Sequence, residues 1–223
     1  MEEIRLVEIK EEIMSDNINL AEQLRERLAN EKTFLLNLMA SPGGGKTSLI
    51  LKTIEALKND FSLGIIEADI DSMVDAEKVA AQGVQAIQLR TGGFCHLDAA
   101  MVEKGLDGLD LSKLDLIIIE NVGNLVCPAE FDTGAVKNIM ILSVPEGDDK
   151  PLKYPLMFTV SNVLIVNKMD YLELSDFDLK AMRERVLKLN PDIQIFEVSC
   201  RTGEGIKEWA EWLKKEVKDF ISK

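Results

Sequence analysis

The amino-acid sequence predicts an α/β protein whose mostly parallel sheet is covered by helices on both faces. From residue 33 onward, short apolar runs bounded by Gly, Pro, Asp or Asn alternate with segments whose apolar residues recur every three to four positions. The short runs are typical of buried strands, and the longer spacing is typical of helices. Because strands that alternate with helices are joined by crossover connections, neighbouring strands run parallel. The length of 223 residues suits one such domain.

Each element follows from its own pattern. The seven predicted strands are Phe34–Met39, Leu63–Ala68, Ala86–Leu89, Leu116–Ile119, Ile139–Val144, Val163–Val166 and Ile193–Val198. The predicted helices between them include Thr47–Asn59, Asp75–Gln82, Phe177–Leu189 and Gly205–Ile221. The segment Pro145–Pro155 holds three of the six prolines and many charges, so we expect a surface loop there.

A further helix is expected before the first strand. Apolar residues at helical spacing occupy Asp16–Asn30, and either Asp16 or Asn17 can cap its N-terminus. We expect this helix to pack on the sheet or on a partner. The predicted organisation is a helical extension over residues 1–30 followed by a single nucleotide-binding domain over residues 31–223.

Charge and cysteine content exclude several classes of partner. The chain has 39 acidic and 26 basic side chains, a formal charge of −13. Such a field repels nucleic acid and anionic membrane surfaces, so neither is an expected partner. The N-terminus lacks the pattern of a signal peptide, and apolar runs are too short to span a bilayer. With only three cysteines, the chain is expected to be cytoplasmic.

A glycine-rich segment follows the first strand and precedes a helix. Residues Ala40–Thr47 have the sequence A-S-P-G-G-G-K-T, close to the phosphate-loop pattern G-x-x-x-x-G-K-[ST]. Such a loop wraps backbone N–H groups around phosphate, with the lysine reaching the β and γ groups and the hydroxyl binding Mg²⁺. The predicted nucleotide contacts here are Pro42, Gly43, Gly44, Gly45, Lys46, Thr47 and Ser48. The fold expected is therefore the three-layer P-loop NTPase fold.

One departure from that pattern concerns Ala40, which replaces the first glycine. A methyl group is tolerated there if φ stays negative, so the substitution bears on the backbone and leaves the phosphate contacts intact. A glycine-rich turn with an accidental Gly-Lys-Thr is the alternative, and the flanking strand and helix argue against it.

The strand Val163–Val166 runs into Asn167, Lys168, Met169 and Asp170, the N-K-x-D pattern that reads guanine in GTPases. Asp170 can accept from the N1–H and N2–H₂ groups of guanine, a donor pair that adenine lacks. Adenine would leave the carboxylate unpaired and is rejected. The stem of Lys168 can cover the ring, and Asn167 can tie this loop to the phosphate loop. Alone the pattern could be a polar turn, but its place after a phosphate loop favours guanine recognition.

A second base-recognition segment follows the last strand. Ser199, Cys200 and Arg201 begin a loop that continues T-G-E-G and resembles the S-A-K-type loop of GTPases, whose backbone N–H groups contact the guanine O6. Cys200 is interpreted as a small loop residue without chemistry of its own.

Magnesium and switch residues are expected at two strand ends. Glu120 ends one strand and Gly123 follows three residues later, the layout of the D-x-x-G switch with Glu in place of Asp. The carboxylate would hold Mg²⁺, and the Gly123 N–H would sense the γ-phosphate. Asp69 is a second candidate for the Mg²⁺ site. Asp75 either orients the attacking water or caps its helix, and the sequence leaves these two roles open.

A thiol and imidazole group lies outside these motifs. His96, the only histidine, adjoins Cys95, and Cys127 follows Gly123 by four residues. Two thiolates and one imidazole suit Ni²⁺ or Zn²⁺. Since a structural zinc site takes four ligands, three per chain indicate an open site or one shared across a dimer. Buried cysteines beside a surface histidine are the alternative that spacing alone leaves open.

Taken together, these residues resemble the HypB family, GTPases that assist nickel insertion into [NiFe]-hydrogenases. The resemblance runs from about Leu35 to the end of the chain, and its most specific segments are C-H-L-D from Cys95 and E-N-V-G-N-L-V-C-P-A from Glu120. The related UreG family would show a Cys-Pro-His metal motif, which this sequence lacks.

The resemblance implies a SIMIBI-class fold, slow hydrolysis of GTP to GDP, and a homodimer favoured by nucleotide. It implies a nickel or zinc site at the dimer interface built from Cys95, His96 and Cys127, and a role for Lys153 in reaching phosphate across the dimer. The implied partners are the hydrogenase large subunit and a second nickel accessory protein. The family's cysteine-rich N-terminal motif and histidine-rich stretch are absent from the sequence, so nickel storage is not expected.

Alternative functions are a urease-type nickel accessory GTPase, a P-loop NTPase acting without metal, and a nucleotide-binding module that buffers zinc.

Overall fold

A single parallel sheet forms the centre of the computed structural model, which describes residues 9–69, 79 and 81–223. Its strand order is β3-β2-β4-β1-β5-β6-β7, and every pairing is parallel. The strands are β1 Phe34–Ala40, β2 Leu63–Asp69, β3 Gln85–Arg90, β4 Leu116–Glu120, β5 Lys137–Ser143, β6 Val163–Asn167 and β7 Gln194–Glu197. Each of the seven predicted strands is confirmed, with ends within two residues of the expected ones.

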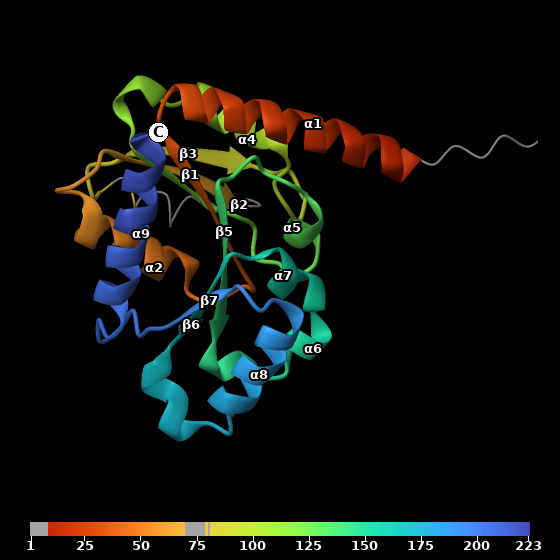
Figure 1. Ribbon diagram of the computed structural model, residues 1–223, viewed down its shortest axis with the longest axis vertical. Coiled ribbons are helices and arrows are strands. Elements are labelled where there is room, and N and C mark those ends of the chain that lie inside the picture. Colours follow the sequence, from red (N-terminus) through yellow and green to blue (C-terminus); the bar gives the residue numbers. More distant parts are fainter. Residues whose placement is uncertain (1–8, 70–78, 80) are drawn as a thin grey trace, which may run out of the picture.

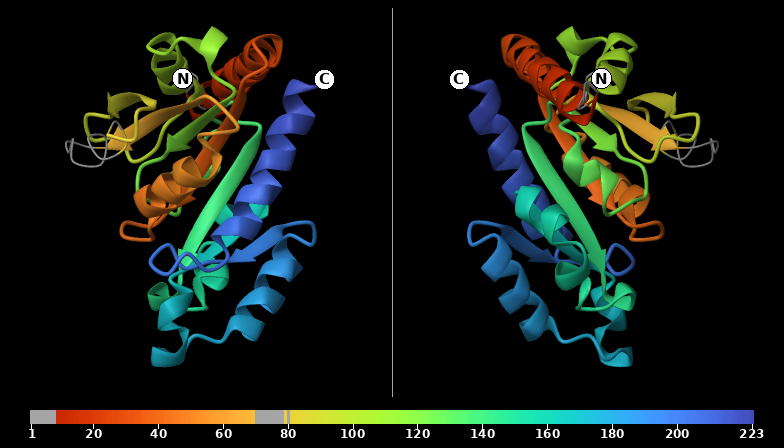
Figure 2. Two further views of the ribbon diagram at one scale, coloured as in Figure 1. Left: turned by 90° about the vertical axis from the view of Figure 1, so that its left-hand side faces the viewer. Right: turned by 90° about the vertical axis from the view of Figure 1, so that its right-hand side faces the viewer.

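Helices cover both faces of this sheet, as expected (Figures 1 and 2). The α-helices are α1 Ile9–Asn30, α2 Lys46–Leu57, α4 Ala99–Asp107, α5 Cys127–Glu130, α6 Lys150–Lys153, α7 Pro155–Val160, α8 Leu179–Leu189 and α9 Ile206–Ile221. The 3₁₀ turns within the described residues are η1 Leu111–Lys113, η2 Val144–Glu146 and η3 Met169–Leu174. The predicted helix Asp75–Gln82 falls largely outside the described residues. Among the described helices, none is long and apolar enough to cross a bilayer.

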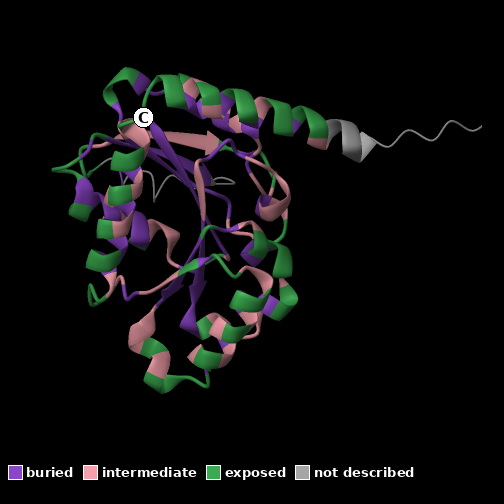
Figure 3. Cartoon of the chain, in the orientation of Figure 1, coloured by how far each residue is buried: buried purple, intermediate pink, exposed green. Residues whose placement is uncertain are grey.

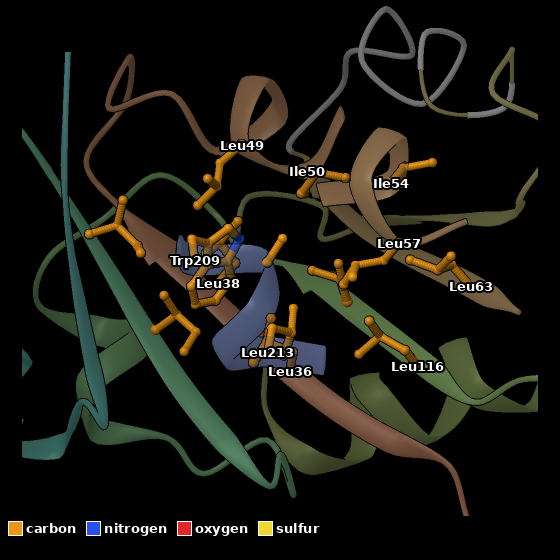
Figure 4. Close-up of a cluster of buried hydrophobic side chains, with 14 of the residues drawn as sticks. Leu36, Leu38, Leu49, Ile50, Ile54, Leu57, Leu63, Leu116, Trp209 and Leu213 are labelled. Carbon is orange, nitrogen blue, oxygen red and sulfur yellow. The ribbon is translucent and has the colours of Figure 1, made fainter. Parts of the chain in front are cut away.

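Alternate residues of each strand point to opposite faces, which divides the core. Leu36 and Leu38 of β1 join one cluster with α2 and α9, where Trp209 and Leu213 lie against them (Figure 4). Leu35 joins a second cluster with α1 and α4 on the other face. A third cluster, on the same face as the second, packs β5 and β6 against α7 and α8. The strands β1, β4 and β6 are buried along their whole length, the edge strands β3 and β7 are only partly buried, and the outer helix surfaces are exposed (Figure 3).

The first helix begins earlier than the sequence indicated. α1 starts at Ile9, because the Lys and Glu residues before Asp16 also favour a helix. Neither Asp16 nor Asn17 is therefore an N-cap; both lie inside the helix, and Asn17 is buried. The capping prediction was wrong because the side chain of Asn17 contacts distant backbone groups instead.

The expectation of a surface loop over Pro145–Pro155 was also wrong. This segment contains most of η2, all of α6 and the first residue of α7. Pro145, Pro151 and Pro155 each occupy the first turn of one of these helices. Proline is tolerated there because the first N–H groups of a helix have no partner within it. The prolines thus mark helix starts.

Candidate nucleotide and metal site

The phosphate loop lies where β1 gives way to α2. Ala40 is the last residue of β1 and has the extended backbone of a strand, so its methyl group causes no strain. Gly45 has φ of 102° and precedes Lys46, the first residue of α2. A Cβ on Gly45 would collide with the side-chain amide of Asn167. Glycine is therefore required at this position both for the backbone conformation and for the close approach of the base-recognition loop.

That loop is bonded directly to the phosphate loop. The Asn167 Nδ2 donates to the Gly44 carbonyl at 3.1 Å, and the Lys168 Nζ donates to the Gly43 carbonyl at 2.8 Å. Lys168 adopts a left-handed backbone with φ of 61°. The Asn167 Oδ1 accepts from the Lys168 N–H at 2.8 Å, which stabilises this turn. The two segments, more than 120 residues apart in the sequence, form one surface.

A pocket of about 410 Å³ opens between these loops. It is lined by the predicted residues Gly45, Ser48, Asn167, Lys168, Asp170, Cys200 and Arg201, and additionally by Pro145 and Tyr171. A volume of this size accommodates a small ligand. Neither Pro145 nor Tyr171 belongs to a nucleotide-binding motif, and the only signal for Tyr171 is that it directly follows Asp170.

The carboxylate of Asp170 is held in place by the neighbouring loop. The Ser199 Oγ donates to its Oδ1 at 2.6 Å, and the Arg201 Nη1 lies 3.4 Å from its Oδ2. The hydrogen bond from Ser199, with the charge of Arg201, lowers the pKa of Asp170 below its usual value. The group therefore stays ionised as an acceptor well into the acidic range.

Three polar side chains gather beside the phosphate loop on the α2 face of the sheet. The Thr47 Oγ1 donates to the Glu120 Oε1 at 2.9 Å. Glu120 of β4 lies opposite Glu67 of β2 in the register of the sheet, and both carboxylates are buried. A hydroxyl and two carboxylates are oxygen ligands of the kind that Mg²⁺ prefers. Glu67 was missed in the sequence, although a charged residue within an apolar strand was a signal.

The side chains of two acidic candidates lie outside the described part of the molecule. Asp69 is the last residue of β2, two positions beyond Glu67, and its side chain lies outside the described part of the molecule. Asp75 also falls outside the described residues. Their proposed roles stay predictions.

The switch segment after β4 touches the phosphate loop. A Cβ on Gly123 would lie 3.1 Å from the Pro42 Cα, so any larger residue would push the two backbones apart by a few tenths of an ångström. Asn121 is fully buried, and its Oδ1 accepts from the N–H of Leu97 at 3.2 Å. The Asn124 Nδ2 donates to the Cys95 carbonyl at 3.3 Å. One segment thus contacts the phosphate loop and the loop that follows β3.

Cys95, His96 and Cys127 come together at the far end of the segment after β4, where Cys127 lies. The Cys95 Sγ lies 2.9 Å from the Cys127 Sγ and 3.8 Å from the His96 Nδ1, and the three ligand atoms all lie within 4.8 Å of one another. The His96 ring stacks on Phe131, with centroids 3.8 Å apart and an interplanar angle of 18°. Residues 32 positions apart in the sequence therefore form one half-buried donor set.

The pKa values of two of these groups are shifted by their surroundings. Burial lowers the pKa of His96, which favours the neutral imidazole that a metal requires. The hydrogen bond with Cys95 raises the pKa of Cys127 above its usual value. Because a metal ion binds thiolates, metal binding at this pair would release protons.

Cys200 lies away from this group, in the wall of the nucleotide pocket. Burial raises the pKa of its thiol to about 11. We expect iodoacetamide to alkylate Cys200 about 100-fold more slowly at pH 8 than a free cysteine, because only the thiolate reacts. Mass spectrometry of the Cys95→Ala, Cys127→Ala double variant measures this rate. A rate equal to that of free cysteine would show that the thiol is neither buried nor protected.

Comparison with known proteins places this geometry in a family. The profile described as "CobW/HypB/UreG, nucleotide-binding domain" matches residues 34–197. The curated "Hydrogenase maturation factor HypB" of Azotobacter vinelandii is 46% identical over 212 residues, which are 95% of this chain and 70% of that protein. The chain belongs to the HypB family. It is accordingly a member of the P-loop NTPases that carry the CobW/HypB/UreG domain.

Two solved HypB structures share its fold. The structure titled "Crystal structure of HypB from Helicobacter pylori in complex with nickel" has a TM-score of 0.87 at 39% identity and covers 92% of this chain and 96% of its own. HypB from Archaeoglobus fulgidus has a TM-score of 0.85 at 38% identity, covering 91% of this chain and 99% of its own. The resemblance read from the sequence is therefore confirmed at the level of the HypB family.

Proposed function

We propose that this protein is a GTP-hydrolysing metallochaperone that supplies nickel for the maturation of [NiFe]-hydrogenase. One observation carries the proposal: the segment from Glu120 to Cys127 contacts the phosphate loop at one end and bears a candidate metal ligand at the other. The cargo is suggested by relatives named hydrogenase maturation factors and by the nickel complex of Helicobacter pylori HypB.

Four residues are proposed to act on the phosphates. Lys46, at the start of α2, neutralises charge on the β and γ groups, and helix α2 presents its N–H groups to them. Gly123 donates its N–H to the γ-phosphate, Glu120 holds magnesium, and Asp75 orients the attacking water. Attack of that water on the γ-phosphorus breaks the bond to the β–γ bridging oxygen and gives GDP and phosphate.

Base selection is assigned to the loops around Asp170. Its carboxylate accepts from the guanine N1–H and N2–H₂, while Ser199 and Arg201 hold it in position. The Cys200 N–H, which donates to the Asn167 Oδ1 at 3.4 Å, is assigned to contact the base O6. Lys168 covers the ring, and Asn167 supports the loop from the phosphate side.

Magnesium fits the oxygen donors next to Lys46. Thr47 and Glu120 would hold it, with Glu67 in the adjacent strand contributing charge and Asp69 as a further candidate. Bound there, the ion would neutralise charge on the β and γ oxygens during phosphoryl transfer.

Coupling between nucleotide and metal is proposed to act through two asparagines. Asn121 accepts from the Leu97 N–H, one residue after His96, and Asn124 donates to the Cys95 carbonyl. Any shift of the segment on loss of the γ-phosphate therefore moves the backbone that carries two of the three metal ligands. Such a shift gives the two nucleotide states different metal affinities.

Nickel or zinc fits the donor set of two thiols and one imidazole within 4.8 Å. Three ligands leave room for a further ligand, which a second protomer or the receiving protein would supply. We propose a homodimer favoured by GTP. In this protomer Lys153 is paired with Asp149 at 2.6 Å, an exposed contact that costs little to break if Lys153 reaches across a dimer.

The receiving partners proposed are the hydrogenase large subunit and a second nickel accessory protein, in the cytoplasm. A urease-type role is a second candidate, because the Helicobacter pylori relative, 40% identical, is named a hydrogenase/urease maturation factor.

A titration of nickel and of zinc into the purified protein tests this proposal. We expect metal affinity and oligomeric mass to differ between the complexes with GDP and with a non-hydrolysable GTP analogue. The Lys46→Ala variant should show no nucleotide dependence. Equal affinities and equal mass with both nucleotides would overturn the coupled mechanism, and a strong preference for zinc in both states would favour a buffering role.

A further inference from the structure

Helix α1 lies across the two segments that carry the candidate metal ligands. One segment runs from Cys95 into the start of α4, and the other runs from Cys127 through α5 to Ala135. Figure 1 shows α1 passing above α4 and α5. Ala21, Leu24 and Leu28 of α1 share a buried cluster with Leu97, Ala99 and Ala135 of these segments.

A single side chain of α1 is bonded to both segments. The Asn17 Oδ1 accepts from the Ala99 N–H at 2.9 Å, and its Nδ2 donates to the Asp132 carbonyl at 3.0 Å. The Ala99 N–H is one of the first groups of α4 and has no partner within that helix. Asn17 is only 8% exposed; its bond to the Ala99 N–H is buried and its bond to the Asp132 carbonyl is partly buried, so leaving either backbone group unpaired is costly.

A second residue of α1 holds the Cys127 segment. The Arg25 Nη2 lies 2.5 and 2.6 Å from the two carboxylate oxygens of Asp132, and its Nε donates to the Ala135 carbonyl at 3.3 Å. Gly134 lies between Asp132 and Ala135 in the chain. It has φ of 77°, and a Cβ on Gly134 would lie 2.9 Å from the Leu24 Cβ. The segment therefore lies directly on the helix surface.

The residues that α1 holds are close in the chain to the metal ligands or to a ring that stacks on one of them. Asp132 follows Phe131, whose ring stacks on His96. Ala99 lies three residues after His96 in the chain. Leu97, which directly follows His96, is fully buried. Holding Ala99 and Asp132 at a fixed separation therefore fixes how Cys95, His96 and Cys127 face one another.

We propose that α1 is an integral part of the metal site, with Asn17 and Arg25 as positioning residues that hold the two ligand-bearing segments together. This inference rests on the metal site of the proposed function. It differs from the sequence-based view of residues 1–30 as an extension of the domain. The expected cost of losing such outer contacts is a 10- to 100-fold loss of metal affinity, on the order of that found for supporting residues of metal sites.

The test compares four variants of the full chain. Asn17→Ala removes both bonds, Asn17→Asp keeps the acceptor for Ala99 but loses the donor to Asp132, and Arg25→Ala releases the Asp132 carboxylate. Arg27→Ala is the matched control, because Arg27 lies on the same helix and pairs with the exposed Asp107 side chain at 2.9 Å. Nickel and GDP affinities, the nickel–thiolate absorption band and the melting temperature are measured for each.

We expect Asn17→Ala to weaken nickel binding about 10-fold and to change the absorption band, while GDP affinity stays within about twofold. Asn17→Asp should show a loss at least as large, because its carboxylate would face the Asp132 carbonyl without a donor between them; Arg25→Ala should show a smaller loss, and Arg27→Ala none. Nickel affinity equal to that of the wild type in all variants would overturn the inference. Parallel losses of nickel affinity, GDP affinity and melting temperature would also overturn it, since they indicate a general stabilising role.

A second measurement on metal-free protein separates this inference from the proposed function. Alkylation of Cys95 and Cys127 should be several-fold faster in Asn17→Ala than in the wild type, with Cys200 as the internal reference. If the wild type binds neither nickel nor zinc, the metallochaperone proposal fails. Faster alkylation in Asn17→Ala would still show that α1 holds the two thiol-bearing segments in position. Unchanged alkylation of both thiols would contradict it whether or not metal binds.

Discussion

Replacing Asp170 with asparagine is expected to lower the affinity for GTP about 100-fold and to create affinity for xanthosine triphosphate. The carboxylate accepts two hydrogen bonds from guanine, whereas asparagine offers one acceptor and one donor. Its amide would face the N2–H₂ of guanine, donor against donor. Xanthine carries an oxygen at that position and matches the amide. Ser199 can still donate to the side-chain oxygen, so the loop itself is expected to keep its conformation.

Isothermal titration with both nucleotides measures this switch. Asp192→Asn is a suitable control, because it makes the same chemical change at an exposed site outside the nucleotide pocket. If Asp170→Asn binds GTP as the wild type does, Asp170 does not read the base. Loss of affinity for both nucleotides would instead indicate that the loop is disrupted.

The second large effect is a loss of metal affinity when either Cys127 or Cys95 is replaced. Cys127→Ala should reduce nickel and zinc affinity about 100-fold or more, since it removes one of three ligands within 4.8 Å. Cys95→Ala should have a similar effect. GTP affinity should change by less than about twofold in both variants, because neither thiol lines the nucleotide pocket.

The third cysteine provides the control for this experiment. Cys200 lies in the wall of the nucleotide pocket, and its raised pKa keeps it protonated at neutral pH. Cys200→Ala should leave metal affinity unchanged. Metal binding that survives in Cys127→Ala and disappears in Cys200→Ala would require a different ligand set.

Much of the fold was predictable from the sequence because the chain obeys simple periodicities. Strands buried on both faces are continuous apolar runs, as in β4 and β6, and the partly buried β3 and β7 were found from shorter apolar runs, so all seven strands could be found from their residues. The prediction of a loop at Pro145–Pro155 failed because proline interrupts a helix internally but is compatible with its first turn. The expected cap at Asn17 failed because its hydrogen-bond partners lie 82 and 115 residues away.

The site was predictable in kind more than in detail. Motif residues such as Lys46 and Asp170 follow the carboxyl ends of parallel strands, which meet at one edge of the sheet. The closeness of Cys95 to Cys127 could not be derived from spacing, because it depends on how the loops after β3 and β4 cross the end of the intervening β2. Glu67 was missed because no linear motif includes it, and its importance arises from its register with Glu120.

Two buried asparagines, Asn37 and Asn121, and the half-buried Asn138 also bear on how the chain reaches its native strand alignment. The Asn121 Nδ2 donates to the Asn37 Oδ1 at 3.1 Å, and the Asn37 Nδ2 donates to the Asn138 Oδ1 at 2.9 Å. The rest of β1, β4 and β5 is mainly Leu, Ile and Met, and such strands could slide by two residues and still bury the same apolar face. Such a slip would separate the amides inside an apolar core, so misaligned sheets are penalised during folding.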